Sequence, residues 1–270
     1  MKMEILLEAK NLSKKYVKTT GFFTRTQTVI KALDNISVSI KKGITLAVVG
    51  ESGSGKSTLA KSLIRLIDID NGSITFRNKN MRTINGDTLK STRKNIQMIF
   101  QDPYASLNPR MKIQSIMEEP LLIHKIGTKI SKQKKIETMI KKVGLHSSDL
   151  DKYPHQFSGG QRQRIGIARA LILEPKLVIC DEPVSALDVS VQAQIVQLLK
   201  SLQKEFGLTY LFITHDLRIV RHIADEVVVM RHGKIVEAGK TDIIFQNPKT
   251  TYTKKLLASI PGTKKSTLKD

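Results

Sequence analysis

One glycine-rich segment, residues 50–58, constrains the fold of this chain more than any other feature. A continuous apolar run at residues 44–49 precedes it, as a buried strand would, and Leu59, Leu63 and Leu66 follow it at helical spacing. A strand that enters a glycine-rich turn and continues into a helix directs backbone N–H groups and the positive helix end at one point. That point is suited to an anion. The segment reads Gly50, Glu51, Ser52, Gly53, Ser54, Gly55, Lys56, Ser57 and Thr58.

The spacing matches the P-loop, in which two glycines flank four residues and are followed by lysine and serine or threonine. The glycines allow the backbone to turn so that several N–H groups converge on phosphate oxygens. Lys56 is predicted to reach the β- and γ-phosphates, and the Ser57 hydroxyl to ligate Mg²⁺. The alternative, a surface loop rich in glycine and serine, is disfavoured by the flanking strand and helix. A nucleotide that carries β- and γ-phosphates, together with Mg²⁺, is therefore the predicted ligand.

An acidic pair follows a second apolar strand, as the metal site beside a P-loop requires. Residues 177–180 are apolar and lead directly to Asp181 and Glu182. Ligands of open α/β sheets bind at the carboxyl ends of such strands. Asp181 is predicted to hold Mg²⁺ through water, and Glu182 to orient or deprotonate the attacking water. Apolar runs that end in aspartate are common, so the acidic pair indicates a metal site only in combination with the P-loop.

Apolar strands alternate with helical patterns along the chain, which indicates an α/β sheet with helices on its faces. The polar stretch 17–28 is predicted to separate the first two strands, and the helical region at about 103–172 looks like an insertion. No apolar run approaches the roughly 20 residues that span a bilayer. The predicted strands are 6–12, 29–40, 44–49, 73–76, 96–100, 177–180, 208–213, 226–230 and 234–238, and the clearest helices are 161–173, 191–203 and 217–223.

The net charge of +21 points to polyanionic partners, namely nucleic acid, anionic lipid or nucleotide phosphates. Lysines concentrate in residues 125–142, which hold seven, and in residues 247–270, which hold six. A solvated basic surface is the plain alternative. Sequence-specific DNA binding ranks last, because no recognition motif accompanies the charge. The single cysteine, Cys180, lies in an apolar strand and is predicted to be a buried core residue.

Residues 157–164 place Ser158, Gly159 and Gly160 at the start of a second helix, before Gln161. Exposed amides and the helix dipole make this another anion site by the same reasoning. One nucleotide has no use for two such sites on one chain. The economical inference is that this segment faces a nucleotide held by the P-loop of another subunit, so that two chains bury two ATP molecules head to tail. A glycine hinge before a basic helix is the alternative.

In the order of these motifs the chain resembles the ATP-binding cassette (ABC) ATPases over about residues 4–260. Gln101 is similar to the Q-loop glutamine of that family, residues 185–188 to its D-loop, and His215 to its switch histidine. Phe157 replaces the leucine that is commoner at the head of the signature segment. Tyr16 sits where the family stacks an aromatic ring on adenine, with Phe22 and Phe23 as rivals.

The resemblance implies a P-loop NTPase core of the ABC type, in the α/β class, with an N-terminal antiparallel β subdomain and an inserted helical subdomain. One cassette would span residues 1–247, with the helical subdomain at about 103–172, and a basic extension would follow at 248–270. The implied catalytic residues are Lys56, Gln101, Glu182 and His215, and the implied metal ligands are Ser57, Gln101 and Asp181. The implied nucleotide contacts are Tyr16, residues 50–58, Ser158, Gly159, Gly160, Gln161 and Asp188.

A finer resemblance is to the cassettes of peptide importers, carried by residues 101–110, 153–157 and 170–175 and by the tail 252–257 with Pro261. Lysine and threonines stand at 249–251 where a His-Pro pair is usual. The chain lacks the cysteine cluster that some partner cassettes carry near the tail, which implies that it is the other member of a heterodimeric pair. Nickel and antimicrobial-peptide systems share these motifs, so the solute stays open.

The resemblance also implies partners. The chain would power uptake of oligopeptides or dipeptides together with a second cassette, two membrane permeases and, indirectly, an extracytoplasmic solute-binding protein. It would lie at the cytoplasmic face of the plasma membrane, with residues 103–125 docked on a permease, and would bind no specific nucleic acid. The alternative is a soluble ABC ATPase that acts on nucleic acid, ribosomes or cofactor assembly. The charge favours that alternative, and the single cassette disfavours it.

Overall fold

The chain folds into two compact units. A computed structural model describes residues 4–20 and 26–260. The first unit combines residues 1–83 with residues 212–270, and the second unit holds residues 84–211. The second unit is thus an insertion in the sequence of the first.

The first unit opens with an antiparallel sheet in which β1 pairs with both β2 and β4, and β4 also pairs with β5. Residues 17–28 were predicted to separate the first two strands. For residues 17–20 and 26–28, which the structure describes, this prediction was wrong, because both strands continue into that stretch. Val17 faces Val29 there, and such β-branched cross-strand pairs stabilise a sheet. Phe22 and Phe23 lie outside the described residues. The strands are β1 (Ile5–Thr20), β2 (Thr26–Lys41), β4 (Asn71–Phe76) and β5 (Lys79–Asn80).

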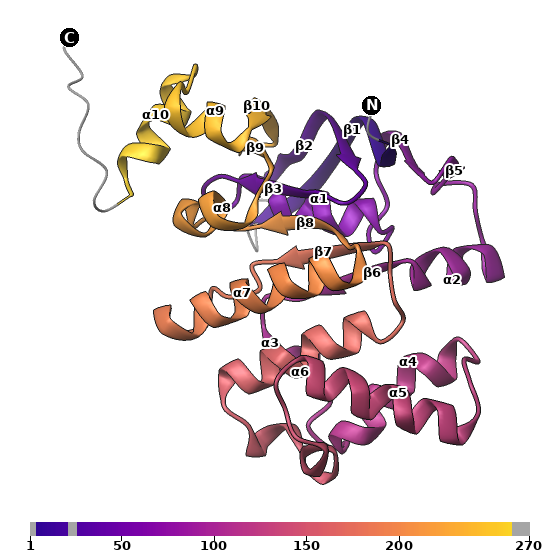
Figure 1. Ribbon diagram of the computed structural model, residues 1–270. Coiled ribbons are helices and arrows are strands. Elements are labelled where there is room, and N and C mark those ends of the chain that lie inside the picture. The colour runs from indigo at the N-terminus through magenta and orange to yellow at the C-terminus, as the bar shows by residue number, and fades with distance from the viewer. Residues whose placement is uncertain (1–3, 21–25, 261–270) are drawn as a thin grey trace. The chain divides into compact units, whose positions relative to one another are not determined.

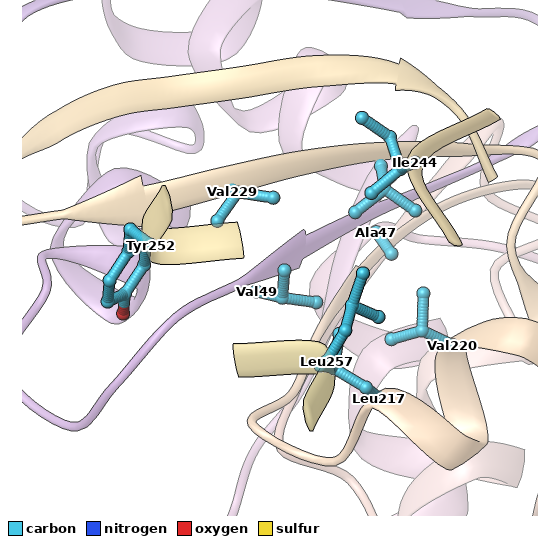
Figure 2. Packing of buried hydrophobic residues seen from close by; sticks show 9 residues of the cluster. Ala47, Val49, Leu217, Val220, Val229, Ile244, Tyr252 and Leu257 are labelled. Carbon is cyan, nitrogen blue, oxygen red and sulfur yellow. The ribbon is translucent and has the colours of Figure 1, made fainter. Parts of the chain in front are cut away.

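A second group of strands in the first unit contains β3 (Thr45–Val49), which is parallel to β9 (Glu226–Arg231). All five residues of β3 are buried, as expected of an interior parallel strand. β10 (Lys234–Lys240) pairs antiparallel with β9 after a tight turn. Figure 2 shows Ala47, Val49 and Val229 of these strands packed with residues of the helices. Those helices are α8 (Leu217–Ile223), α9 (Thr241–Gln246) and α10 (Thr251–Ala258).

In the second unit β6 (Ile96–Ile99) runs parallel to β7 (Leu177–Asp181). β8 (Thr209–Ile213) begins in this unit on the other side of β7, and its last two residues belong to the first unit. β7 and β8 are buried throughout, and Cys180 of β7 has no exposed surface, which confirms that it is a core residue. The flanking helices are α2 (Gly86–Lys94) and α7 (Val189–Phe206), and α7 ends at Gly207 in the left-handed conformation that favours glycine.

Helices occupy the region between β6 and β7, and α4, α5 and α6 lie together there (Figure 1). α5 buries Ile136 and Ile140, and none of its lysines is among its buried residues. Three of those lysines form ion pairs, Lys132 with Glu118, Lys135 with Glu174 and Lys142 with Glu205, so part of the basic surface is neutralised locally. The elements are α3 (Pro103–Ser106), α4 (Ile113–Ile123), α5 (Lys129–Lys142), η1 (Ser147–Asp151), η2 (Pro154–Gln156) and α6 (Gly159–Leu171).

The helix after the P-loop is shorter than its pattern predicts. α1 (Lys56–Leu63) ends before Arg65, which has a positive φ of 55°, and Leu66 is half exposed beyond it. The left-handed backbone at Arg65 is incompatible with continued helix. Within residues 4–20 and 26–260, none of the helices combines the length and apolar character that crossing a bilayer requires.

Candidate functional site

The P-loop has the backbone conformation that its glycines predict. Gly50 has a φ of 150° and Gly55 a φ of 105°. A Cβ at Gly50 would collide with the carbonyl oxygen of Met230, and a Cβ at Gly55 with that of Ala32. Glycine is therefore required at both positions by the close approach of neighbouring backbone. Gly53, with a φ of 79°, meets nothing within 4 Å, so only its conformation favours glycine.

Two polar groups lie inside the loop. The Lys56 side chain is only 5% exposed, and its Nζ donates to the carbonyl oxygens of Gly50 and Glu51 at 2.8 Å each. The Ser54 hydroxyl is buried and makes no hydrogen bond. A buried amine and an orphaned hydroxyl in a nest of glycine backbone fit phosphate oxygens, so the loop suits the predicted nucleotide. Glu51 and Ser52 are exposed on the loop, and Ser57 and Thr58 lie half-buried in the first turn of α1.

His215 belongs to the first unit and lies just after the end of β8. The Thr214 N–H donates to the carbonyl oxygen of Val48 at 3.2 Å, which places this turn beside the strand that leads into the P-loop. Asp216 caps α8 through the Arg218 N–H and forms an ion pair with the Arg218 guanidinium at 2.7 Å. Burial alone would raise the pKa of Asp216, but the hydrogen bonds and charge of Arg218 outweigh it and hold the pKa below its ordinary value.

Tyr16 lies on β1 opposite Ile30, and its side chain is 42% exposed. The Lys14 Nζ is 5.7 Å from the centre of its ring. A half-exposed aromatic ring beside a cation can stack on a flat base, so the predicted role of Tyr16 is compatible with its setting.

The second unit joins the Q-loop to the acidic strand end. Asp181 is the last residue of β7 and is 5% exposed. The next residue, Glu182, has a φ of 48°, a strained conformation for a residue other than glycine, and such strain is concentrated at functional sites. The Gln101 amide nitrogen donates to Glu182 Oε2 at 3.3 Å. Two residues predicted separately, 81 positions apart, are therefore neighbours.

Ser158 is the N-cap of α6, the helix that carries the signature segment. Its hydroxyl accepts from the Gln161 N–H, and the Gln161 side chain accepts from the Ser158 N–H at 3.0 Å, which forms a capping box. A Cβ at Gly160 would lie 2.6 Å from Val191 Cγ1. The small residues therefore allow the signature segment to lie against the start of α7, where Asp188 is the N-cap.

The sequence reasoning missed two arginines of α6. The guanidinium of Arg162 lies 3.8 Å from the ring centre of Tyr104 and donates to the carbonyl oxygens of Pro154 and His155. Arg169 donates to the carbonyl oxygen of Ser106 at 2.5 Å. Both contacts tie α6 to the segment after Gln101. The basic residues at 162 and 169 were visible, but no local pattern shows that they reach residues about 60 positions away.

Tyr252 of α10 was also missed as a site residue. Its hydroxyl accepts a hydrogen bond from the Glu51 N–H at 3.2 Å, and the Arg231 guanidinium lies 4.8 Å from its ring centre. Tyr252 is 9% exposed and belongs to the apolar cluster of the first unit. The contact spans 201 positions. The sequence alone offered only the resemblance of residues 252–257 to the tails of peptide-importer cassettes.

The first unit therefore brings the P-loop, the turn of His215 and Tyr252 onto adjoining elements, and holds Tyr16 on its antiparallel sheet. The second unit joins Gln101 to Glu182 next to Asp181, and sets Ser158, Gly159 and Gly160 against the start of α7. Within the described residues no group of three or more histidine, cysteine, aspartate or glutamate side chains is placed to hold a metal. The loop provides phosphate chemistry, and the second unit provides a carboxylate oriented by an amide.

Comparison with known proteins agrees with this chemistry. The sequence model described as "ABC transporter" matches residues 33–185. The oligopeptide transport ATP-binding protein AppF of Bacillus subtilis (strain 168) is 51% identical over 97% of this chain and 80% of its own length. The dipeptide transport ATP-binding protein DppF of Haemophilus influenzae is 51% identical over 95% of this chain and 78% of its own. OppF of Escherichia coli (strain K12), an oligopeptide transport ATP-binding protein, is 48% identical over 96% and 78%.

Two solved structures are similar at 30% identity and a TM-score of 0.76. One is the dimeric post-hydrolysis state of the ATP-binding cassette MJ0796 bound to ADP and Pi. The match covers 87% of this chain and 98% of the MJ0796 chain. The other is cbiO1 from Clostridium perfringens, part of the ABC transporter complex cbiONQ, which covers 90% and 92%.

Proposed function

This chain belongs to the ABC transporter family, and on that premise we propose that it powers the uptake of oligopeptides or dipeptides through a membrane permease. It is an ATP-binding and ATP-hydrolysing subunit. The predicted fold class, an α/β P-loop core of the ABC type with an antiparallel β subdomain and an inserted helical subdomain, is confirmed by its likeness to solved cassettes.

The assignment to peptides rests on one observation. Relatives with about half of their residues identical, over nearly this whole chain, carry oligopeptide or dipeptide transport in their names. Identity extends far beyond the nucleotide motifs, since the matches reach 97% of the chain. Nickel and antimicrobial peptides remain the alternative solutes.

The chemistry follows from charge and position. Lys56 places a cation on the β- and γ-phosphates, and the amides of residues 50–58 bind the phosphate oxygens. Glu182 polarises the attacking water, and the hydrogen bond from Gln101 orients its carboxylate. His215 bonds the γ-phosphate and aligns that water. Catalysis then consists of positioning and charge stabilisation, as in other phosphoryl transfers.

Mg²⁺ fits the donors at hand, because a hydroxyl, an amide oxygen and a carboxylate are the hard oxygen ligands that this ion prefers. Ser57, Gln101 and Asp181 would hold it, the last through water. Gln101 donates through its amide nitrogen, so its amide oxygen is the atom suited to a cation. The ion would neutralise charge on the phosphates.

Partners complete the proposal. A second cassette, related to this one or identical to it, would complete the nucleotide site. Its residues equivalent to Ser158, Gly159, Gly160, Gln161 and Asp188 would contact the nucleotide held by this chain. Tyr16 of this chain would lie against the adenine. Two permeases would receive residues 103–125, and a solute-binding protein would act outside the membrane. Residues 1–247 would form the cassette, with its helical subdomain at about 103–172, and residues 248–270 a basic extension. The chain would then lie peripherally at the cytoplasmic face of the membrane.

Affinity capture tests the proposal directly. Tagged Glu182→Gln protein, which should trap the closed state, would be isolated from native membranes with Mg-ATP and its partners identified by mass spectrometry. Wild-type protein without nucleotide is the control. We expect two permeases, a second cassette and a solute-binding protein, whose ligand would identify the solute. Ribosomal or nucleic-acid proteins without a permease would instead favour the soluble ATPase.

A further inference from the structure

The peptide group that joins Gly50 to Glu51 is bound at both of its ends. Its carbonyl oxygen, on Gly50, accepts from Lys56 Nζ at 2.8 Å, and its N–H, on Glu51, donates to the Tyr252 hydroxyl at 3.2 Å. Because a peptide group is planar, fixing the direction of both C=O and N–H fixes its orientation. The first turn of the P-loop is therefore held by a residue of the loop and by a residue of α10.

This peptide needs an external partner. Gly50 has a φ of 150°, and the carbonyl oxygen of Met230 occupies the space where a Cβ would be. Glycine gives the backbone more freedom than any other residue, and no side chain at this position can restrict it. The neighbouring Ser54 hydroxyl makes no hydrogen bond. The contact with Tyr252 thus adds a restraint on the N–H side of a peptide that Lys56 holds at its carbonyl oxygen.

Tyr252 is itself well fixed. Its ring packs at one side of the apolar cluster that includes Val49 and Val229 (Figure 2). Val49 directly precedes Gly50, so the same cluster holds the strand that leads into the loop. The Arg231 guanidinium lies 4.8 Å from the ring centre and restricts it from another side.

The start of α10 is anchored as firmly as the ring. The Glu237 carboxylate, on β10, accepts from the N–H groups of Lys249 and Thr250 at 2.8 and 3.0 Å and from the Thr250 hydroxyl at 3.0 Å. The Thr250 hydroxyl in turn accepts from the Thr253 N–H and caps the helix. Hydrogen bonds therefore connect β10 to the start of α10, and a separate hydrogen bond connects α10 to the P-loop.

We propose that Tyr252 is a positioning residue for nucleotide binding: its hydroxyl orients the Gly50–Glu51 peptide so that the later amides of the loop converge on the phosphates. α10 would then set the affinity of this chain for the phosphates of a nucleoside triphosphate. The inference rests on the proposed function of the loop in binding ATP. The competing view is that α10 serves only the packing of the first unit, and removal of the Tyr252 hydroxyl distinguishes the two views.

Tyr252→Phe removes that hydroxyl and keeps the ring in the cluster. In the full-length chain we expect the dissociation constant of a fluorescent ATP analogue, and the KM for ATP, to rise roughly 3- to 10-fold, with kcat within about twofold of wild type. Hydrogen exchange at the Glu51 amide in the nucleotide-free protein should accelerate. That second readout is independent of activity and reports the hydrogen bond itself.

Tyr210→Phe is the matched control, because Tyr210 is a buried tyrosine of the second unit whose hydroxyl donates to the Leu199 carbonyl oxygen. It loses one buried hydrogen bond too, and should lower thermal stability without changing ATP affinity. Thr250→Val loosens the start of α10 while Tyr252 stays intact. We expect it to raise the KM in the same direction by a smaller factor, which serves as a second test if Tyr252→Phe folds poorly.

The inference is overturned if Tyr252→Phe binds the analogue within twofold of wild type and Glu51 exchange is unchanged. Lys56→Ala separates this failure from failure of the proposed function. If Lys56→Ala abolishes binding, the P-loop assignment stands and only the role of Tyr252 falls. If Lys56→Ala binds ATP as well as wild type does, both fall together.

Discussion

Arg162 stacks on Tyr104, with its guanidinium carbon 3.8 Å from the ring centre, and so connects the start of the signature helix to the segment that follows Gln101. The arginine is buried, while the tyrosine is 60% exposed. Arg169, two turns along the same helix, holds the carbonyl oxygen of Ser106. The Q-loop segment and the signature segment are therefore connected by direct side-chain contacts within the second unit.

Tyr104→Ala should weaken that connection. Cation–π contacts contribute about 0.5–2 kcal/mol, so we expect kcat for ATP to fall roughly 2- to 30-fold, with nucleotide affinity close to wild type. Tyr104→Phe keeps an aromatic face over Arg162 and should retain kcat within about twofold. Steady-state ATPase kinetics on the three proteins measure this. Equal kcat in Tyr104→Ala and Tyr104→Phe would show that the stack has no part in turnover.

Glu182→Gln should still bind ATP and yet lose turnover. Removal of a general base costs typically 10²- to 10⁴-fold, so we expect phosphate release to fall at least about 100-fold. Glu174→Gln is the control, since Glu174 pairs with Lys135 at the surface and should leave turnover unchanged. Normal hydrolysis by Glu182→Gln would remove this carboxylate from the mechanism.

Gly160→Ala introduces a Cβ 2.6 Å from Val191 Cγ1. Overpacking of this kind costs about 1–3 kcal/mol, so the thermal midpoint should fall. Val191→Ala in the same chain should restore the stability by removing the methyl groups in contact. ATPase activity distinguishes two roles for Gly160. If the double variant recovers both stability and turnover, the glycine serves helix packing alone, whereas recovery of stability without turnover indicates that it also faces a nucleotide.

Glu237 should contribute to acid sensitivity. Burial alone would raise its pKa, but the hydrogen bonds from Lys249, Thr253 and Thr250 outweigh burial and hold the pKa below the ordinary 4.5. A carboxyl whose folded pKa is depressed stabilises the fold above the unfolded pKa, and that stability is lost as pH falls below about 4.5. The midpoint of thermal unfolding, measured from pH 6 to pH 3, should therefore fall less steeply in Glu237→Gln than in wild type. At pH 6 the midpoint of the variant should already be lower. Parallel pH profiles for the two proteins would contradict this.

The sequence predicted most strands because the signals for strands are local. The apolar runs that became β3 and β7 have strand length, and the glycine spacing at residues 50–55 has few other uses. The helix end at Leu63 was missed, because Leu66 keeps the helical spacing while the left-handed Arg65 ends the helix.

The contacts that complete the site could not be predicted in the same way. The hydrogen bond from Gln101 to Glu182 spans 81 positions, and that from Glu51 to Tyr252 spans 201. Such pairs depend on how β strands order themselves in the sheet and where α10 docks, and no residue pattern within either partner encodes the other. Tyr16 was placed by resemblance, and its role in adenine stacking stays a prediction.

The burial of Cys180 has a practical consequence for spectroscopy. It is the one cysteine of the chain, it lies in β7 without exposed surface, and burial, with the charge of Asp181, raises the pKa of its thiol. Thiol reagents act on the thiolate and need access, so the native protein should be silent to maleimide dyes and spin labels. Any cysteine engineered at the surface would then carry the label alone. Distances between two such labels could follow the catalytic cycle in a background that needs no prior removal of native thiols.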